Sequence, residues 1–135
     1  MHPKLSIVNL PVTDEFLKEK RLVQERGELH LIEDGPCFCH LTCFTLKPGP
    51  GLWRGGHVHS RKTETFYILR GVLTIECVDT HSGERFDAEL RAGDKARISP
   101  GLAHRFSAQE EGGEAVVVEY YDGVYQRDDD QPWDF

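Results

Sequence analysis

The chain has 135 residues, which is enough for one domain with its own core and leaves little room for a second. Apolar residues make up 39% of it and charged residues 29%, and no apolar run approaches the ~18 residues of a membrane-spanning helix. With 16 Lys and Arg against 23 Asp and Glu, the formal charge is -7, so most of the surface would repel nucleic acids and anionic membranes.

The N-terminus carries a single cation and no apolar stretch typical of a secretory signal, so we expect a cytoplasmic protein. Because that compartment keeps thiols reduced, we expect the cysteines to be free: Cys37, Cys39, Cys43 and Cys77. The first three share one face of a predicted strand. A packed row of thiols is favoured there over a zinc site, because a second pair of ligands is missing.

Residues 13–25 are the one helical candidate. Thr13 could cap the first turn, and Asp14 and Glu15 suit the positive end of a helix dipole. The apolar residues of this segment form only a poor stripe. We place it in an N-terminal segment, 1–27, outside the core of the domain.

Short segments rich in β-branched and aromatic residues follow, separated by Gly and Pro turns. The predicted strands are 28–32, 38–46, 56–59, 64–69, 72–78, 86–90, 95–98, 104–107 and 115–121. Strands of this length and spacing are typical of a sandwich or barrel. We therefore predict one all-β domain over 1–135, with its core at about 28–121. The acidic tail, 122–135, is expected to be loosely packed or to reach a neighbouring subunit.

The most informative local feature is a pair of histidines, His57 and His59, which project from the same face if they lie on a strand. Two neutral imidazoles that converge inside a barrel are typical ligands of a first-row transition metal. Glu64 is at an odd offset, but the polar residues 60–63 favour a turn that would return it to the same point. His104 opens a later strand and could enter the same cavity.

A lone histidine pair arises often by chance in a chain with 7 histidines, but the wider spacing is more specific. The spacing of the first cupin motif is reproduced by Gly51, His57, His59, Glu64 and Gly71. Residues 93–106 resemble the second cupin motif. The resemblance implies a double-stranded β-helix, which is a jelly-roll-type barrel. It also implies one divalent metal ion (Mn, Zn, Ni, Co or Fe) held by His57, His59, Glu64 and His104.

Within the cupins, residues 57–71 and 100–106 resemble the D-lyxose isomerase and type II phosphomannose isomerase branches. This implies an aldose–ketose isomerase that acts on a sugar or sugar phosphate through a metal-bound enediolate. Such a reaction needs a base, and the candidates are Lys62, which matches a lysine of the lyxose isomerase motif, and Glu119. Glu119 is either a buried functional group or the solvent-facing member of its strand, and Lys62 could equally be a solvated turn residue.

Two alternatives remain, because a cupin fold and its ligand set do not choose the reaction. One is an iron-dependent dioxygenase and the other is a non-catalytic cupin that binds a sugar or another small molecule. If the substrate carries a phosphate, the candidates for a clamp are Arg54, Arg61, Arg70 and Arg105. Because unpaired edge strands invite pairing, we expect a homodimer.

Overall fold

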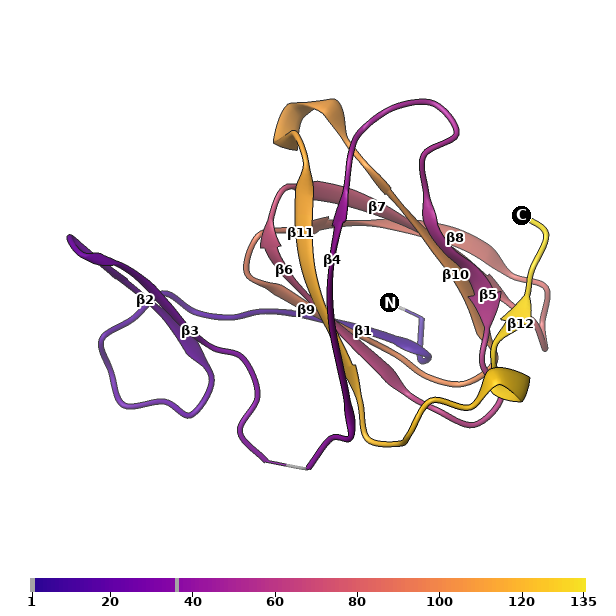
Figure 1. The fold of residues 1–135 in the computed structure, drawn as a ribbon, viewed down its shortest axis with the longest axis horizontal. Coiled ribbons are helices and arrows are strands. Elements are labelled where there is room, and N and C mark those ends of the chain that lie inside the picture. Colours follow the sequence, from indigo (N-terminus) through magenta and orange to yellow (C-terminus); the bar gives the residue numbers. More distant parts are fainter. Residues whose placement is uncertain (1, 36) are drawn as a thin grey trace.

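Short antiparallel strands dominate the computed structural model, which describes residues 2–35 and 37–135. Two five-stranded sheets face each other and close around the core, with the orders β1-β9-β6-β11-β4 and β12-β5-β10-β7-β8 (Figure 1). The bounds are β1 Leu5–Asn9, β2 Lys20–Gln24, β3 Gly27–Leu31, β4 His40–Leu46, β5 Arg54–Val58, β6 Glu64–Arg70, β7 Val72–Asp79, β8 Arg85–Arg91, β9 Asp94–Ile98, β10 Leu102–Ala108, β11 Ala115–Tyr121 and β12 Gln131–Pro132. The prediction of an all-β barrel is confirmed.

The core lies between the two sheets and follows the alternation of side chains along each strand. On β7, Leu73, Ile75 and Cys77 are buried in it, and on β11 Ala115 and Val117 occupy the same interior. Every strand predicted from the sequence is present, and only the ends shift by a few residues. The strands that the sequence analysis missed are β1, β2 and β12.

The helix predicted at 13–25 is wrong. Residues 20–24 form β2, which pairs with β3 across a tight turn, and the described residues hold no helix except the 3-10 helices η1 (Glu110–Gly112) and η2 (Arg127–Asp129). Pairing with a neighbouring strand satisfies the backbone of β2, whereas a helix here would have had no apolar face to bury. Phe16, which such a face would have needed, is 96% exposed.

The β2–β3 hairpin projects from the barrel as an arm (Figure 1). The ammonium group of Lys95 lies at the base of this arm and contacts the carboxylates of Glu19 and Glu33. Lys95 is only 8% exposed. Lys95 Nζ also donates to the Ile32 carbonyl oxygen at 3.1 Å. The arm is therefore anchored by a desolvated ion-pair cluster rather than by a large apolar contact.

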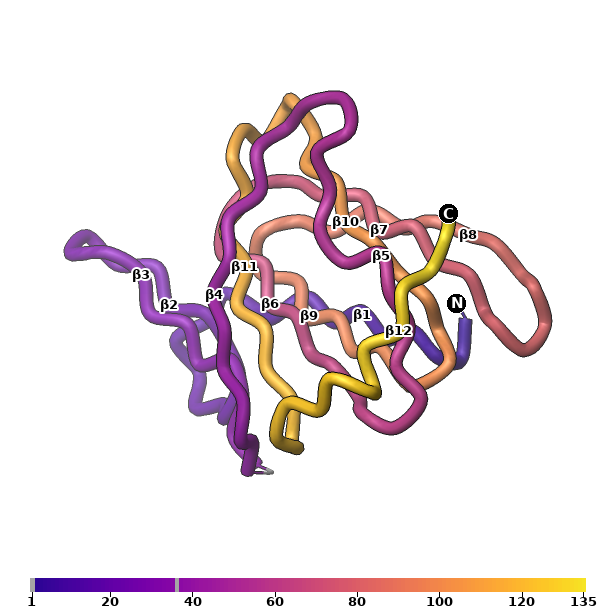
Figure 2. The backbone as a smooth tube through the Cα atoms, turned by 45° about the vertical axis from the view of Figure 1, so that its right-hand side comes forward, coloured from indigo at the N-terminus to yellow at the C-terminus, as the bar shows by residue number. Residues whose placement is uncertain are grey.

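The acidic tail is neither loosely packed nor extended away from its own chain. It turns through η2 and runs back beside β5, where β12 pairs with Val58 and His57 (Figure 2). Asp129 of this tail is buried. These contacts could not be predicted from the sequence, because the partners of Asp129 lie far away in the chain.

All four cysteines are free thiols, as predicted. The packed row expected for Cys37, Cys39 and Cys43 is wrong, because all three are exposed and only Cys77 is buried. Their strand face lies on the outside of the barrel, beside the exposed Leu41.

No helix among the described residues is long and apolar enough to cross a membrane. The predicted homodimer stays a prediction. Within the described part of the chain, the edge strands of the two sheets are β1, β4, β8 and β12, so each could pair further.

A β-bulge between β5 and β10 changes the direction of β5, the strand that carries His57. His104 pairs with His57 whereas Arg105 pairs with Gly55, so one residue of β5 is extra. Gly55 has a φ of +91°, and a Cβ atom there would lie 2.9 Å from the carbonyl oxygen of His104. Both the backbone conformation and the available space therefore require glycine.

We expect Gly55→Ala to destabilise the protein more than Gly83→Ala. Both glycines have positive φ (Gly83 +78°), which costs an alanine about 1–2 kcal/mol, but a Cβ at Gly83 meets nothing within 4 Å. Overpacking against β10 should cost Gly55→Ala a further ~1–3 kcal/mol in free energy of unfolding. Urea denaturation measures both variants, and equal losses would show that β10 yields freely at this point.

The N-terminus is tied to the end of β7 by Asp79. Its Oδ1 accepts hydrogen bonds from Lys4 Nζ at 2.7 Å and from the His81 backbone N–H at 2.9 Å, and its Oδ2 lies 3.2 Å from His2 Nε2. The hydrogen bond from Lys4, with that from His81, lowers the pKa of Asp79 from 3.8 to about 2.

Asp79 should therefore contribute to stability in a defined pH range. Because its pKa is lower in the folded state, the contribution is present above about pH 4 and is lost as the pH falls toward 2. We expect Asp79→Asn to unfold at lower urea concentration than wild type at pH 6, with the difference shrinking below pH 4. Asp87→Asn, at an exposed position of β8, is the control; a pH-independent gap for Asp79→Asn would contradict this account.

Candidate metal centre

Three strands and one loop bring the four predicted ligands together at one end of the barrel. His57 lies on β5 and His59 directly follows it, Glu64 is the first residue of β6, and His104 lies on β10 opposite His57. One ligand atom from each of these four side chains lies within 4.8 Å of the others. Among the described residues this is the only such group, and it contains no cysteine.

The ligand atoms at the centre are buried and lack hydrogen-bond partners. Glu64 Oε2 lies 3.2 Å from His59 Nε2 and 3.1 Å from His104 Nε2, yet none of these three atoms makes a hydrogen bond. Glu64 is 1% exposed and His104 is fully buried. An unpaired polar atom in a protein interior is costly, and a divalent cation would satisfy all three at once. The donor set therefore fits a metal ion.

The opposite ring nitrogens of the histidines all face oxygen atoms. His59 Nδ1 lies in a hydrogen bond of 2.7 Å with the Asp129 carbonyl oxygen, and His104 Nδ1 in one of 3.1 Å with that of Leu102. His57 Nδ1 lies 2.9 Å from Asp130 Oδ1. An Nδ1 that carries the proton leaves the Nε2 lone pair free for a metal.

The protonation of the ligands follows from their burial and mutual contacts. Burial, together with the charge of His104, lowers the pKa of His57 to about 4, so His57 is neutral at pH 7. Burial would raise the pKa of Glu64, but the adjacent imidazoles of His104 and His59 lower it well below its usual range. Burial acts to lower the pKa of His59, and the Glu64 carboxylate outweighs it and raises that pKa.

Glu119 faces the interior of the barrel. It shares a face of β11 with Ala115 and Val117, which are both in the core, so the solvent-facing alternative does not apply. Burial, together with the nearby negative charge of Glu64, raises its pKa to about 8. The sequence alone could not distinguish the two faces, because β11 is apolar on both.

Lys62 lies on the other side of Glu64. Its Nζ is 3.8 Å from Glu64 Oε1 and 3.8 Å from the centre of the Tyr121 ring. The side chain is only 12% exposed, so it is not a solvated turn residue. It contacts the carboxylate of Glu64 and does not line the cavity that His57 shares with Glu119.

That cavity is the opening to the centre, with a volume of about 190 Å³. His57 and Glu119 reach it from opposite sheets, and Arg54 lies at its wall. The rest of its lining is largely aromatic and includes Phe44, Phe66 and Phe106. The arrangement can hold a small molecule with its polar end toward His57 and its remaining surface against phenylalanine rings.

The other arginine candidates do not line the cavity. Arg61 lies 2.9 Å from the exposed carboxylate of Asp128, Arg105 pairs with Glu76, and Arg70 is exposed at the end of β6. Sequence reasoning also missed Asp129 and Asp130, whose contacts with the histidines span about half of the chain. The run of three aspartates was a visible signal, but its composition alone suggested a solvated tail.

The comparisons agree with this geometry at the level of the fold. A family model described as Cupin domain matches residues 43–121. No curated protein sequence matches the chain.

Solved structures of sugar-modifying enzymes are similar in fold. A sugar 3,4-ketoisomerase from Thermoanaerobacterium thermosaccharolyticum, in complex with TDP, has a TM-score of 0.70 at 16% identity, over 96% of this chain and 88% of its own. A TDP-quinovose 3,4-ketoisomerase from Campylobacter jejuni has a TM-score of 0.74 at 15% identity, over 97% and 94%. A dTDP-4-dehydrorhamnose 3,5-epimerase from Sulfolobus tokodaii has a TM-score of 0.75 at 16% identity, over 98% and 78%.

Proposed function

The chain belongs to the cupin domain family, and on this basis we propose that it is a metal-dependent isomerase of a small sugar or sugar phosphate. The observation that carries the proposal is the cavity in which Glu119 faces His57, one of the four residues suited to hold a divalent ion. A carboxyl group and a metal ligand on opposite walls of one small cavity suit proton transfer next to a carbonyl group.

The metal would be held by His57, His59, Glu64 and His104. When bound, it would supply a Lewis acid that draws electron density from a carbonyl oxygen of the substrate. Glu119 would take the proton from the carbon beside that carbonyl and return it to the former carbonyl carbon, while the proton of the adjacent hydroxyl group would move to the former carbonyl oxygen. Arg54, at the cavity wall, would bind an anionic or hydroxylated end of the substrate.

Lys62 has a different role in this proposal from the one expected of a base. Its ammonium group faces Glu64 and the Tyr121 ring and does not line the cavity. We therefore treat it as a positioning residue that keeps Glu64 charged and in place, and we assign proton transfer to Glu119.

The size of the cavity limits the substrate. At about 190 Å³ it is smaller than the ~300–1,000 Å³ of ordinary ligand pockets, and it suits a monosaccharide better than a nucleotide sugar. The similar structures named as sugar 3,4-ketoisomerases and a 3,5-epimerase support sugars as the substrate class. The TDP of one of them would find no room in this cavity, so we propose a free or phosphorylated sugar.

Metal content tests the first half of the proposal. We expect protein purified without chelator or histidine tag to hold close to one divalent ion per chain, measured by plasma mass spectrometry. His104→Ala should lose it, because His104 is one of the four converging ligands and is fully buried beside Glu64. If the wild type held no metal even after reconstitution, the proposed metal site would be overturned.

Solvent exchange tests the second half. In deuterated water, wild type should wash deuterium into a substrate found among a panel of aldoses, ketoses and their phosphates. Glu119→Gln should bind metal normally and exchange about 100-fold or more slowly, since general bases typically contribute ~10²–10⁴-fold. The control is Glu114→Gln, at an exposed position just before β11.

The outcomes separate the alternatives. Metal retention with no exchange on any sugar, together with ligand binding, would favour a non-catalytic binding cupin. Predominant iron with oxygen uptake would favour a dioxygenase, which could use the same four ligands. Equal exchange by wild type and Glu119→Gln would leave the isomerase but transfer the base to another residue.

A further inference from the structure

We propose that the C-terminal segment 126–135 is a clasp that positions two of the histidine ligands, with Asp130 as a positioning residue for His57. The inference rests on the metal site proposed above. It assigns part of the metal affinity to a segment that lies outside both cupin motifs.

The clasp pairs with β5, the strand that carries His57. β12 pairs with β5 at Val58 and His57, and the backbone N–H of Trp133 donates to the Gly56 carbonyl oxygen at 2.9 Å. The segment therefore follows β5 along the residues on either side of His57. Figure 2 shows this course, with the end of the chain beside β5.

Asp129 fixes the loop between the second histidine and the glutamate. Its Oδ1 accepts hydrogen bonds from Ser60 N at 2.9 Å, Ser60 Oγ at 2.8 Å and Arg61 N at 3.0 Å, and its Oδ2 accepts one from Lys62 N at 3.3 Å. The residue is 2% exposed. A buried carboxylate with four donors determines the shape of this loop, which connects His59 to Glu64.

The same segment supplies the partners of two ring nitrogens. The carbonyl oxygen of Asp129 accepts the hydrogen bond from His59 Nδ1, and the carboxylate of Asp130 lies 2.9 Å from His57 Nδ1. Such contacts hold the proton on Nδ1 and fix the ring plane, so that Nε2 faces the centre. Of the three histidines, only His104 takes its Nδ1 partner, Leu102, from its own strand.

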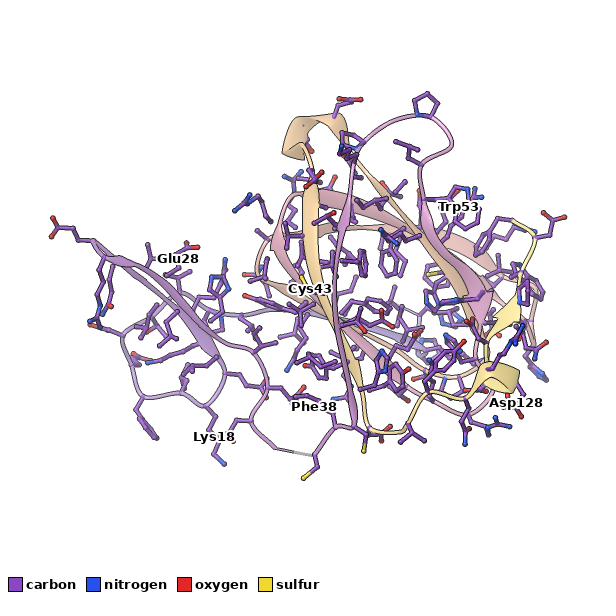
Figure 3. The ribbon with its side chains drawn as sticks, viewed as in Figure 1. Lys18, Glu28, Phe38, Cys43, Trp53 and Asp128 are labelled. Carbon is purple, nitrogen blue, oxygen red and sulfur yellow. The ribbon has the colours of Figure 1, made fainter. Side chains whose placement is uncertain are left out.

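The three consecutive aspartates therefore differ in what they contact. Asp128 lies on the surface at η2 (Figure 3), and its side chain is 77% exposed. Its carboxylate pairs with Arg61 and contacts no histidine. Asp128 thus offers a control of identical chemistry, two residues from Asp130.

Binding of a metal and ordering of the clasp should support each other. A segment that places two ligands correctly raises metal affinity, and by thermodynamic reciprocity the bound metal stabilises the segment. Backbone amides of the clasp, such as that of Trp133, should therefore exchange with solvent more slowly in the metal-loaded protein.

The test compares Asp130→Ala with Asp128→Ala by Zn²⁺ binding at pH 7.5, in competition with a chromophoric chelator. Loss of an outer partner of a metal-ligating histidine typically weakens metal binding by about 10–100-fold, and we expect a loss of that size for Asp130→Ala. Asp128→Ala should stay within about twofold of wild type, because its carboxylate contacts no ligand. The side chain of Asp130 is 34% exposed, so its removal should leave the fold intact.

A second measurement needs no metal. Long-range proton–nitrogen NMR spectra of the metal-free protein report which ring nitrogen carries the proton. We expect the Nδ1–H form for His57 in wild type and a shift toward a mixture of tautomers in Asp130→Ala. A purely structural role for Asp130 would not change the tautomer of His57.

The two measurements also separate the clasp from the proposed function. Zn²⁺ binding that is equal in wild type and Asp130→Ala would overturn the clasp and leave the metal site in place. No Zn²⁺ binding by wild type, with His57 still in the Nδ1–H form, would overturn the metal site and show that the contact with Asp130 serves another purpose. An Nε2–H form of His57 in wild type would overturn the clasp directly.

Discussion

Three buried ligand atoms that face one another without hydrogen bonds are the constraint around which this end of the barrel is organised. Glu64 Oε2 and the Nε2 atoms of His59 and His104 lie close together in a region closed to water. A protein interior tolerates such a group only when something compensates it, and the geometry and chemistry of these donors suit a divalent ion. Much of the surrounding structure serves to keep these atoms aimed at one point.

Two features of the backbone keep these atoms directed at one point. The bulge at Gly55 turns β5 so that His57 pairs with His104, and the loop after His59 returns the chain to Glu64. The backbone of this loop donates hydrogen bonds to the buried carboxylate of Asp129, which belongs to the C-terminal segment. Precise ligand placement thus depends on a hydrogen-bonded support as much as on the strands that carry the ligands.

The four predicted ligands and the β2–β3 arm lie in different parts of the molecule. Next to the four predicted ligands, the cavity is small and lined largely by aromatic side chains, and the C-terminal segment pairs with β5 at Val58 and His57. On the outside of the β4–β11 face, the β2–β3 arm stands apart and is tied down by the Lys95 cluster.

Strand periodicity in the sequence predicted the all-β fold, and the resemblance to the two cupin motifs predicted that His57, His59, Glu64 and His104 converge. It failed for the segment 13–25, where strand pairing replaced a helix, and it could not choose the face of Glu119, because β11 is apolar on both sides. Only the tertiary structure decided the role of the acidic tail. Asp129 lies 69 residues from Ser60 in the chain, and a contact over that distance leaves no periodic trace in the sequence.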